Sequence, residues 1–213
     1  MSSVAALTGI LLALLIGAAS PGPSFIIVSR ISIAASRSEG LAAALGMGVG
    51  GAVFGSLALL GLTALLLQVA WLYLILKFAG GAYLIYLGVR IWRAASEPLV
   101  LPETGRAGRR GLLRAFWLAL LIQISNPKTA IVYASIFAAL LPAAPPLWML
   151  VTLPPLIFCV EAGWYATVAL VFSASGPRSI YLASKAWIDR LAGSVMAALG
   201  LRLVIDGLKR QPS

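Results

Sequence analysis

The chain has 213 residues, of which 61% are hydrophobic and only 10% are charged. A soluble domain carries about 25% charged residues, so this composition excludes a soluble fold and indicates an integral membrane protein. The formal net charge of +10 does not indicate nucleic-acid binding, because the basic residues lie in short segments between apolar runs without interleaved aromatic residues. A membrane helix needs about 20 apolar residues, which leaves room for about six such helices and no soluble domain.

The sequence lacks the residues that many metal and redox sites require. It contains no histidine, and its one cysteine, Cys159, has no second thiol for a disulfide or a Cys-X-X-Cys pair. Histidine metal sites and histidine acid–base chemistry are therefore excluded. We expect no metal, no cofactor and no enzymatic activity, with a Ser/Lys dyad left open as one enzymatic alternative.

The first apolar run, residues 4–29, is interrupted by Pro21, Gly22 and Pro23. Proline lacks an amide proton and its ring clashes with the preceding turn, so the helix must open there. Open backbone at membrane depth is tolerated only where it is buried in protein or lines a wet cavity. We therefore expect these residues and Ser24 to line a substrate site. A kink that only allows the helices to pack is the alternative.

The second predicted helix, residues 40–67, follows a short polar loop that contains Arg30, Arg37 and Glu39, and it is rich in glycine. Glycines at positions 46 and 50, and again at 51 and 55, form two small-xxx-small pairs. Such pairs let neighbouring membrane helices approach closely, so we expect packing rather than ligand contact from them.

A third helix is predicted over residues 72–92, and the long polar segment 93–114 is predicted to be a loop between two halves of the chain. The first half then covers about residues 1–95 and the second about residues 112–210. The whole chain, residues 1–213, is predicted to be a single membrane domain.

The second half opens with a predicted helix over residues 112–141 that is interrupted at Asn126, Pro127 and Lys128. Residues 147–172 form the fifth predicted helix. Residues 173–189 are predicted to be a basic loop before a sixth helix over residues 187–208.

Each half ends in a similar segment. Gly81, Leu87, Gly88 and Arg90 match Gly193, Leu199, Gly200 and Arg202 at the same spacing. Three crossings per half make the second half inverted relative to the first, as in many secondary transporters. The predicted fold is an all-α integral membrane protein with six transmembrane helices in two inverted three-helix repeats, with helices 1 and 4 broken at proline motifs.

Basic residues gather in alternate loops, between helices one and two, three and four, and five and six. The positive-inside rule places these loops in the cytoplasm and both termini outside. Lys209 and Arg210, at the C-terminal end, run against this orientation.

The two helix breaks are the predicted binding site. A helix N-terminus presents free amides that suit a carboxylate, and a helix C-terminus presents carbonyls that suit an ammonium group. An amino acid carries both groups and fits between two such breaks. Gln123 and Asn126 can add neutral hydrogen bonds to the substrate, and Pro127 and Lys128 complete the predicted site.

Glu161 is the one carboxylate deep in an apolar run. A carboxyl group removed from water binds a proton more readily, so Glu161 is the candidate for ion coupling or for binding a substrate ammonium. A structural ion pair between Glu161 and Lys128 is the alternative. Trp164 and Tyr165, which follow closely, are candidates to line the cavity.

These motifs resemble the LysE/RhtB family of amino-acid exporters. The resemblance rests on the Pro-Gly-Pro of the first helix, Asn126-Pro127-Lys128, the acidic residue before aromatic residues in the fifth helix, and the two Leu-Gly-x-Arg segments. It covers nearly the whole chain. Family members often have asparagine where this chain has Ser24, and aspartate where it has Glu161, which leaves the substrate open.

The resemblance implies a multi-pass protein of the bacterial inner membrane that exports amino acids or close derivatives by alternating access, coupled to a proton or sodium gradient. The alternatives are a transporter of another small solute, or a membrane-embedded scaffold or enzyme. The partners expected are the amino acid, the coupling ion and the lipid bilayer, with no nucleic acid. A homo-oligomer stays possible, since glycine faces serve packing within or between chains.

Overall fold

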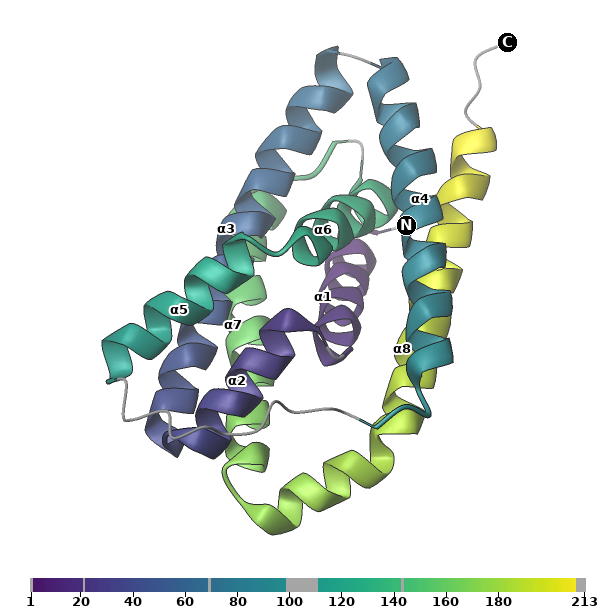
Figure 1. The fold of residues 1–213 in the computed structure, drawn as a ribbon. Helices are drawn as coiled ribbons and strands as arrows, with labels where there is room; N and C mark the ends of the chain where they lie inside the picture. The colour runs from purple at the N-terminus through teal and green to yellow at the C-terminus, as the bar shows by residue number, and fades with distance from the viewer. Residues whose placement is uncertain (1, 21, 69, 99–110, 143, 210–213) are drawn as a thin grey trace.

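A computed structural model of the chain describes residues 2–20, 22–68, 70–98, 111–142 and 144–209. These residues contain eight α-helices and no strand (Figure 1). The helices are α1 (Ser3–Ala19), α2 (Pro23–Ala34), α3 (Arg37–Gln68), α4 (Ala70–Ala94), α5 (Leu112–Ile124), α6 (Pro127–Leu140), α7 (Leu147–Phe172) and α8 (Ser175–Leu208).

The first and fourth predicted helices are each divided into two. α1 and α2 meet at an angle of 60°, and α5 and α6 meet at 58°. Proline occupies the first position of α2 and of α6, where its missing amide costs no hydrogen bond. Asn126 precedes α6 as its N-cap, and its side-chain oxygen accepts a hydrogen bond from the Lys128 amide at 3.0 Å. Pro21 lies outside the described residues.

The described helices provide three clear candidates for membrane crossings: Arg37–Gly61, Leu147–Phe172 and Ser175–Leu208. The count rises to five if each bent pair crosses as one span. α4 is not among the candidates that length and apolar composition select in the described residues. The chain is therefore an all-helical membrane protein, and its six crossings remain a prediction.

The basic loop predicted over residues 173–189 is wrong. α8 begins at Ser175 and continues for 34 residues to Leu208. Pro177 lies in its first turn, where proline is tolerated. Further along, Lys185 and Asp189 form an i,i+4 ion pair with a nitrogen–oxygen distance of 2.7 Å, which supports a helix through the predicted loop.

The predicted loop between the first two membrane helices is also shorter than expected. Arg37 and Glu39 belong to the first turn of α3. The Glu39 amide donates to the Ser36 hydroxyl at 3.2 Å, a capping contact, and an acidic residue is favourable at a helix N-terminus.

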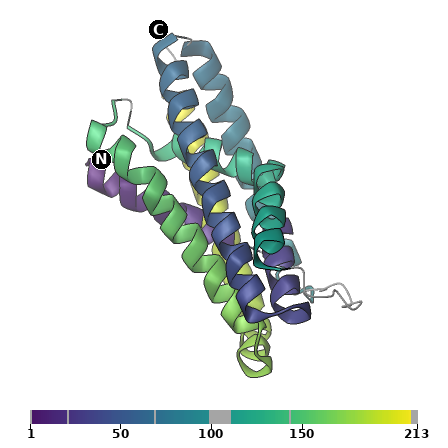
Figure 2. The same cartoon turned by 90° about the vertical axis from the view of Figure 1, so that its left-hand side faces the viewer.

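The glycines of α3 face two different neighbours. A Cβ at Gly46 or Gly50 would meet α5, and a Cβ at Gly51 or Gly55 would meet α7. The two small-xxx-small pairs therefore pack against separate helices, and α3 lies between α5 and α7 (Figure 2). Close packing, as expected for these glycines, brings α5 and α7 toward the same part of α3.

α4 and α8 pack side by side along their length (Figure 1). Gly81 faces the Gly200 carbonyl, and Gly88 faces the Gly193 carbonyl. These are the glycines of the matching segments, and each segment contacts the other at equivalent positions in antiparallel order. The inverted repeat itself stays a prediction, with which these reciprocal contacts agree.

The buried apolar side chains form two clusters. One includes Leu14, Val132 and Tyr133, and the other includes Phe25 and Tyr165. The interior cavity described next is lined by residues of both clusters.

Candidate functional site

A small polar cavity lies where the two helix breaks meet α7. Its volume is about 30 Å³, which is room for one or two water molecules. We call it the central cavity. The polar side chains that line it are Ser20, Ser24, Gln123, Asn126, Lys128, Thr129, Tyr133, Glu161 and Tyr165.

A hydrogen-bond network joins the two breaks across the central cavity. The Ser24 hydroxyl donates to Gln123 Oε1 at 2.6 Å, and Asn126 Nδ2 donates to Ser24 Oγ at 3.1 Å. All three side chains are buried. The network therefore ties the first turn of α2 to the end of α5 and to the cap of α6.

Glu161 is 3% exposed and points into this network from α7. Its Oε1 accepts a hydrogen bond from the Tyr133 hydroxyl at 2.8 Å, whereas its Oε2 accepts from Gln123 Nε2 at 3.5 Å, a long contact. A buried carboxylate must be hydrogen-bonded to be tolerated. One oxygen is thus well satisfied, and the other retains acceptor capacity toward the cavity.

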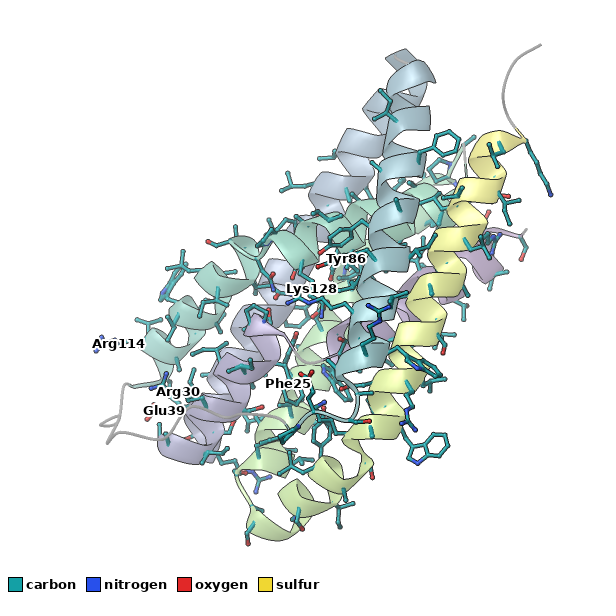
Figure 3. The ribbon with its side chains drawn as sticks, turned by 45° about the vertical axis from the view of Figure 1, so that its right-hand side comes forward. Phe25, Arg30, Glu39, Tyr86, Arg114 and Lys128 are labelled. Carbon is teal, nitrogen blue, oxygen red and sulfur yellow. The ribbon has the colours of Figure 1, made fainter. Side chains whose placement is uncertain are left out.

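Lys128 connects the second break to the first. Its Nζ donates to the Ser20 carbonyl at 3.2 Å, so a cation sits at the C-terminal end of α1, where it is electrostatically favourable. Figure 3 shows Lys128 in the interior of the helices, whereas Arg30, Glu39 and Arg114 gather at one end. The sequence predicts that a carbonyl at the end of a broken helix binds the substrate ammonium. In the structure, the Ser20 carbonyl instead accepts a hydrogen bond from Lys128.

The proposed structural ion pair between Lys128 and Glu161 is not formed at close range. Within the described ranges, no ion pair closer than 4.0 Å joins Lys128 to Glu161, whereas such pairs join Lys185 to Asp189 and Arg202 to Asp206. Lys128 and Glu161 nevertheless line the same cavity, and electrostatic attraction acts between them.

Two glycines of α3 form one wall of the site. A Cβ at Gly51 would lie 2.7 Å from Glu161 Cγ and 2.9 Å from the Tyr133 hydroxyl oxygen. A Cβ at Gly50 would lie 2.6 Å from Gln123 Cγ. Any side chain at these positions would displace the polar residues, so the glycines define where Glu161, Tyr133 and Gln123 can sit.

A second, larger cavity of about 550 Å³ lies beyond the breaks. We call it the vestibule. It shares Ser20, Gly22, Asn126 and Lys128 with the central cavity, and it extends between α2, α4 and α8. The shared residues therefore separate the two spaces.

The structure brings most of the predicted site residues together. Gly22, Ser24, Gln123, Asn126, Lys128, Glu161 and Tyr165 line the central cavity, and Pro23 and Pro127 line the vestibule. Trp164 is not among the residues that line either space, and it packs partly buried against the cluster that includes Tyr165.

Sequence reasoning missed Tyr133 and the buried Lys185–Asp189 pair. The available signal for Tyr133 was its spacing, because Asn126, Thr129 and Tyr133 recur at the interval that puts residues on one helix face. Asp189 falls at the end of the loop predicted over residues 173–189, but it is buried in the middle of α8.

Apolar helices around an internal polar site define a multi-pass helical membrane protein. The model of the LysE type translocator family matches residues 15–207. The chain belongs to this family of translocators, which confirms the resemblance found in its motifs.

Curated relatives cover most of the chain. The threonine efflux protein of Salmonella typhi is 33% identical over 202 residues, covering 88% of this chain and 91% of the relative. The threonine efflux protein of Escherichia coli strain K12 is 31% identical, with the same two coverages of 88% and 91%. The leucine efflux protein of Salmonella choleraesuis is 30% identical over 129 residues, covering 59% of this chain and 58% of the relative. No solved structure matches the chain.

Proposed function

We propose that this protein exports α-amino acids across the bacterial inner membrane by alternating access, with a proton or sodium ion as the coupling ion. The observation that carries the proposal is the meeting of two helix breaks at one buried polar cavity that contains Glu161. Relatives named for threonine and leucine efflux support a neutral amino acid as the substrate.

The size of the central cavity favours a transport cycle over a static binding pocket. Its volume of about 30 Å³ is too small for any amino acid. Substrate binding therefore requires the helices around the breaks to move apart, while the vestibule already gives access to the breaks from one side.

The packing of the two halves supports alternating access. In an inverted repeat, α2 corresponds to α6 and α4 corresponds to α8. α4 packs against α6, but within the described residues α8 makes no comparable contact with α2, and the vestibule occupies that position. If α8 packed against α2 and α4 moved away from α6, the vestibule would close. An equivalent space would then open between α4 and α6, on the opposite side.

The vestibule lies toward the ends of α4 and α8 that adjoin the basic segments of the sequence. The positive-inside rule assigns that side to the cytoplasm and both termini to the outside. An exporter takes its substrate from the cytoplasm, so this orientation agrees with efflux.

Glu161 is the coupling residue in this proposal, because it is buried, lines the central cavity and has one weakly bonded oxygen. The test is uptake of radiolabelled L-threonine and L-leucine into inside-out vesicles under an imposed pH gradient or sodium gradient. Glu161→Gln should abolish gradient-driven uptake and retain exchange of external for internal substrate, which reports folded protein. Asp206→Asn, at an exposed carboxylate of α8, is the matched control.

Gradient-driven uptake at the wild-type rate and with unchanged pH dependence in Glu161→Gln would refute the coupling role. A response to the sodium gradient alone would identify sodium as the ion. Absence of flux for every amino acid tested would contradict amino-acid export and would indicate another small solute as the substrate.

A further inference from the structure

The vestibule contains a buried carboxylate with an unused oxygen. Asp189 is 2% exposed, and its Oδ2 accepts a hydrogen bond from Lys185 at 2.7 Å. Its Oδ1 is buried and has no hydrogen-bond partner. Buried polar atoms are nearly always paired, and an unpaired carboxylate oxygen is costly, so this atom requires an explanation.

Lys185 does not supply the missing partner. Its Nζ also donates to the Ala94 and Ala95 carbonyls, at 3.2 and 3.5 Å, so its three donors are directed to Asp189 Oδ2 and to the end of α4. Lys185 therefore fixes Asp189 in place at the lining of the vestibule and leaves Oδ1 without a partner, so a donor that arrives there reaches Oδ1 after a small movement of the groups that cover it.

A free cation lies across the same space. Arg90 lines the vestibule from α4, its side chain is exposed, and it forms no hydrogen bond or ion pair with any described residue. Its planar guanidinium is well suited to bind a carboxylate through two hydrogen bonds. An unpaired acceptor and an unpaired donor thus line one cavity.

The overall charge of the vestibule disfavours a basic amino acid relative to a neutral one. Arg90, Lys128 and Lys185 are opposed by Asp189 and Glu97, which leaves one positive charge. An amino acid with no net charge adds nothing to this balance, whereas a basic amino acid would bring a further cation beside three others. The volume of about 550 Å³ also accommodates a whole amino acid, which the central cavity does not.

We propose that the vestibule holds a second amino-acid site, in which Asp189 Oδ1 accepts the substrate ammonium and Arg90 binds the substrate carboxylate. This site rests on the proposed function in one respect, that the transported solute is an amino acid. The substrate binds there first and passes Lys128, which lines both spaces, to reach the central cavity.

Protection of a cysteine placed in the vestibule tests this site without requiring transport. Cys159 is exposed and is the only cysteine, so Cys159→Ser gives a thiol-free background. Ile26→Cys then places one thiol in the vestibule lining. The rate of its reaction with a water-soluble maleimide is measured in lipid nanodiscs, with and without L-threonine or L-leucine.

One of these amino acids should slow labelling at least about fivefold. Asp189→Asn should remove the protection, whereas Asp206→Asn, which changes an exposed carboxylate of the same helix, should retain it. Because Asp189→Asn also weakens the buried ion pair, Arg90→Gln provides a second variant that leaves the pair intact. It should weaken protection by L-threonine and leave protection by L-threonine methyl ester unchanged, since the ester has no carboxylate.

Absence of protection by both amino acids would overturn the vestibule site. Protection that survives both Asp189→Asn and Arg90→Gln would also overturn it, because that result describes an indirect closure of the helices. Vesicle flux of the same two amino acids is measured in parallel. Protection without flux would refute the proposed export but not the vestibule site. Flux without protection would refute the vestibule site but not the proposed export.

Discussion

Gly51→Ala tests whether α3 approaches the central cavity as closely as the structure indicates. The added Cβ would lie 2.7 Å from Glu161 Cγ and 2.9 Å from the Tyr133 hydroxyl oxygen. Ordinary contact between such atoms begins at about 3.4 Å, so Glu161 or α3 must move by about 0.7 Å. Both Glu161 and Tyr133 are buried, so the space open to their side chains is limited to the central cavity of about 30 Å³.

Two energies decide the outcome of this substitution. Overpacking costs about 1–3 kcal/mol, and replacing glycine by alanine within a helix returns about 1 kcal/mol. The net loss of stability is therefore small, about 0–2 kcal/mol. The functional loss is larger, because the Tyr133–Glu161 hydrogen bond involves a carboxyl group and is worth about 1.5–3 kcal/mol, a 10- to 100-fold effect.

The assay is gradient-driven uptake of L-threonine or L-leucine into vesicles, together with the apparent unfolding temperature of the purified protein. Gly163→Ala is the matched control, since a Cβ at Gly163 on α7, two residues from Glu161, would meet no atom within 4 Å. We expect Gly51→Ala to lose at least about tenfold in transport and Gly163→Ala to transport normally. Normal transport by both variants would refute the close contact between α3 and Glu161.

Two further substitutions address the hydrogen bonds of the site. Tyr133→Phe removes the donor to Glu161 while keeping the ring in place, so transport should fall about 10- to 100-fold and the unfolding free energy by about 1–3 kcal/mol, because a buried acceptor is left unpaired. Tyr86→Phe, at an exposed ring, should transport normally and keep its stability. Asn126→Ala removes the cap of α6 and the bond to Ser24, so the unfolding free energy should fall by about 0.5–2 kcal/mol. Asn126→Asp keeps a capping oxygen and should recover part of that loss, and equal unfolding temperatures for the two variants would contradict the capping role.

Local chemistry made the helix breaks predictable. Proline is tolerated at the first position of a helix, and Pro23 and Pro127 mark the starts of α2 and α6. Pro154 and Pro155 nevertheless lie inside the continuous helix α7, so proline alone does not determine a break. The fifth predicted helix coincides with α7, Leu147–Phe172, because a long and mostly apolar run favours a continuous helix in a membrane even though it contains Glu161.

The basic segment before the last helix shows where the same reasoning failed. The charged residues within 173–189 predict a loop, but residues 175–189 form the first part of α8. Lys185 and Asp189 satisfy each other along the helix, and Lys185 also reaches the carbonyls that end α4. A charge is compatible with a buried helix when its partner is one turn away, and single-residue polarity does not reveal the partner.

By itself, the sequence determined that this protein is a helical membrane protein of a translocator family, with two interrupted helices and a carboxylate, Glu161, deep in an apolar run. These features follow from composition, from proline geometry and from motifs along the chain. Only the tertiary structure decided that Tyr133 binds Glu161, that Lys128 caps α1, and that Asp189 faces the vestibule with one oxygen unpaired. The physical reason is that membrane helices are apolar on nearly every face. Their hydrophobic pattern therefore does not indicate which face packs against which neighbouring helix. That choice is made by close contact between helices distant in the chain, as at Gly51 of α3.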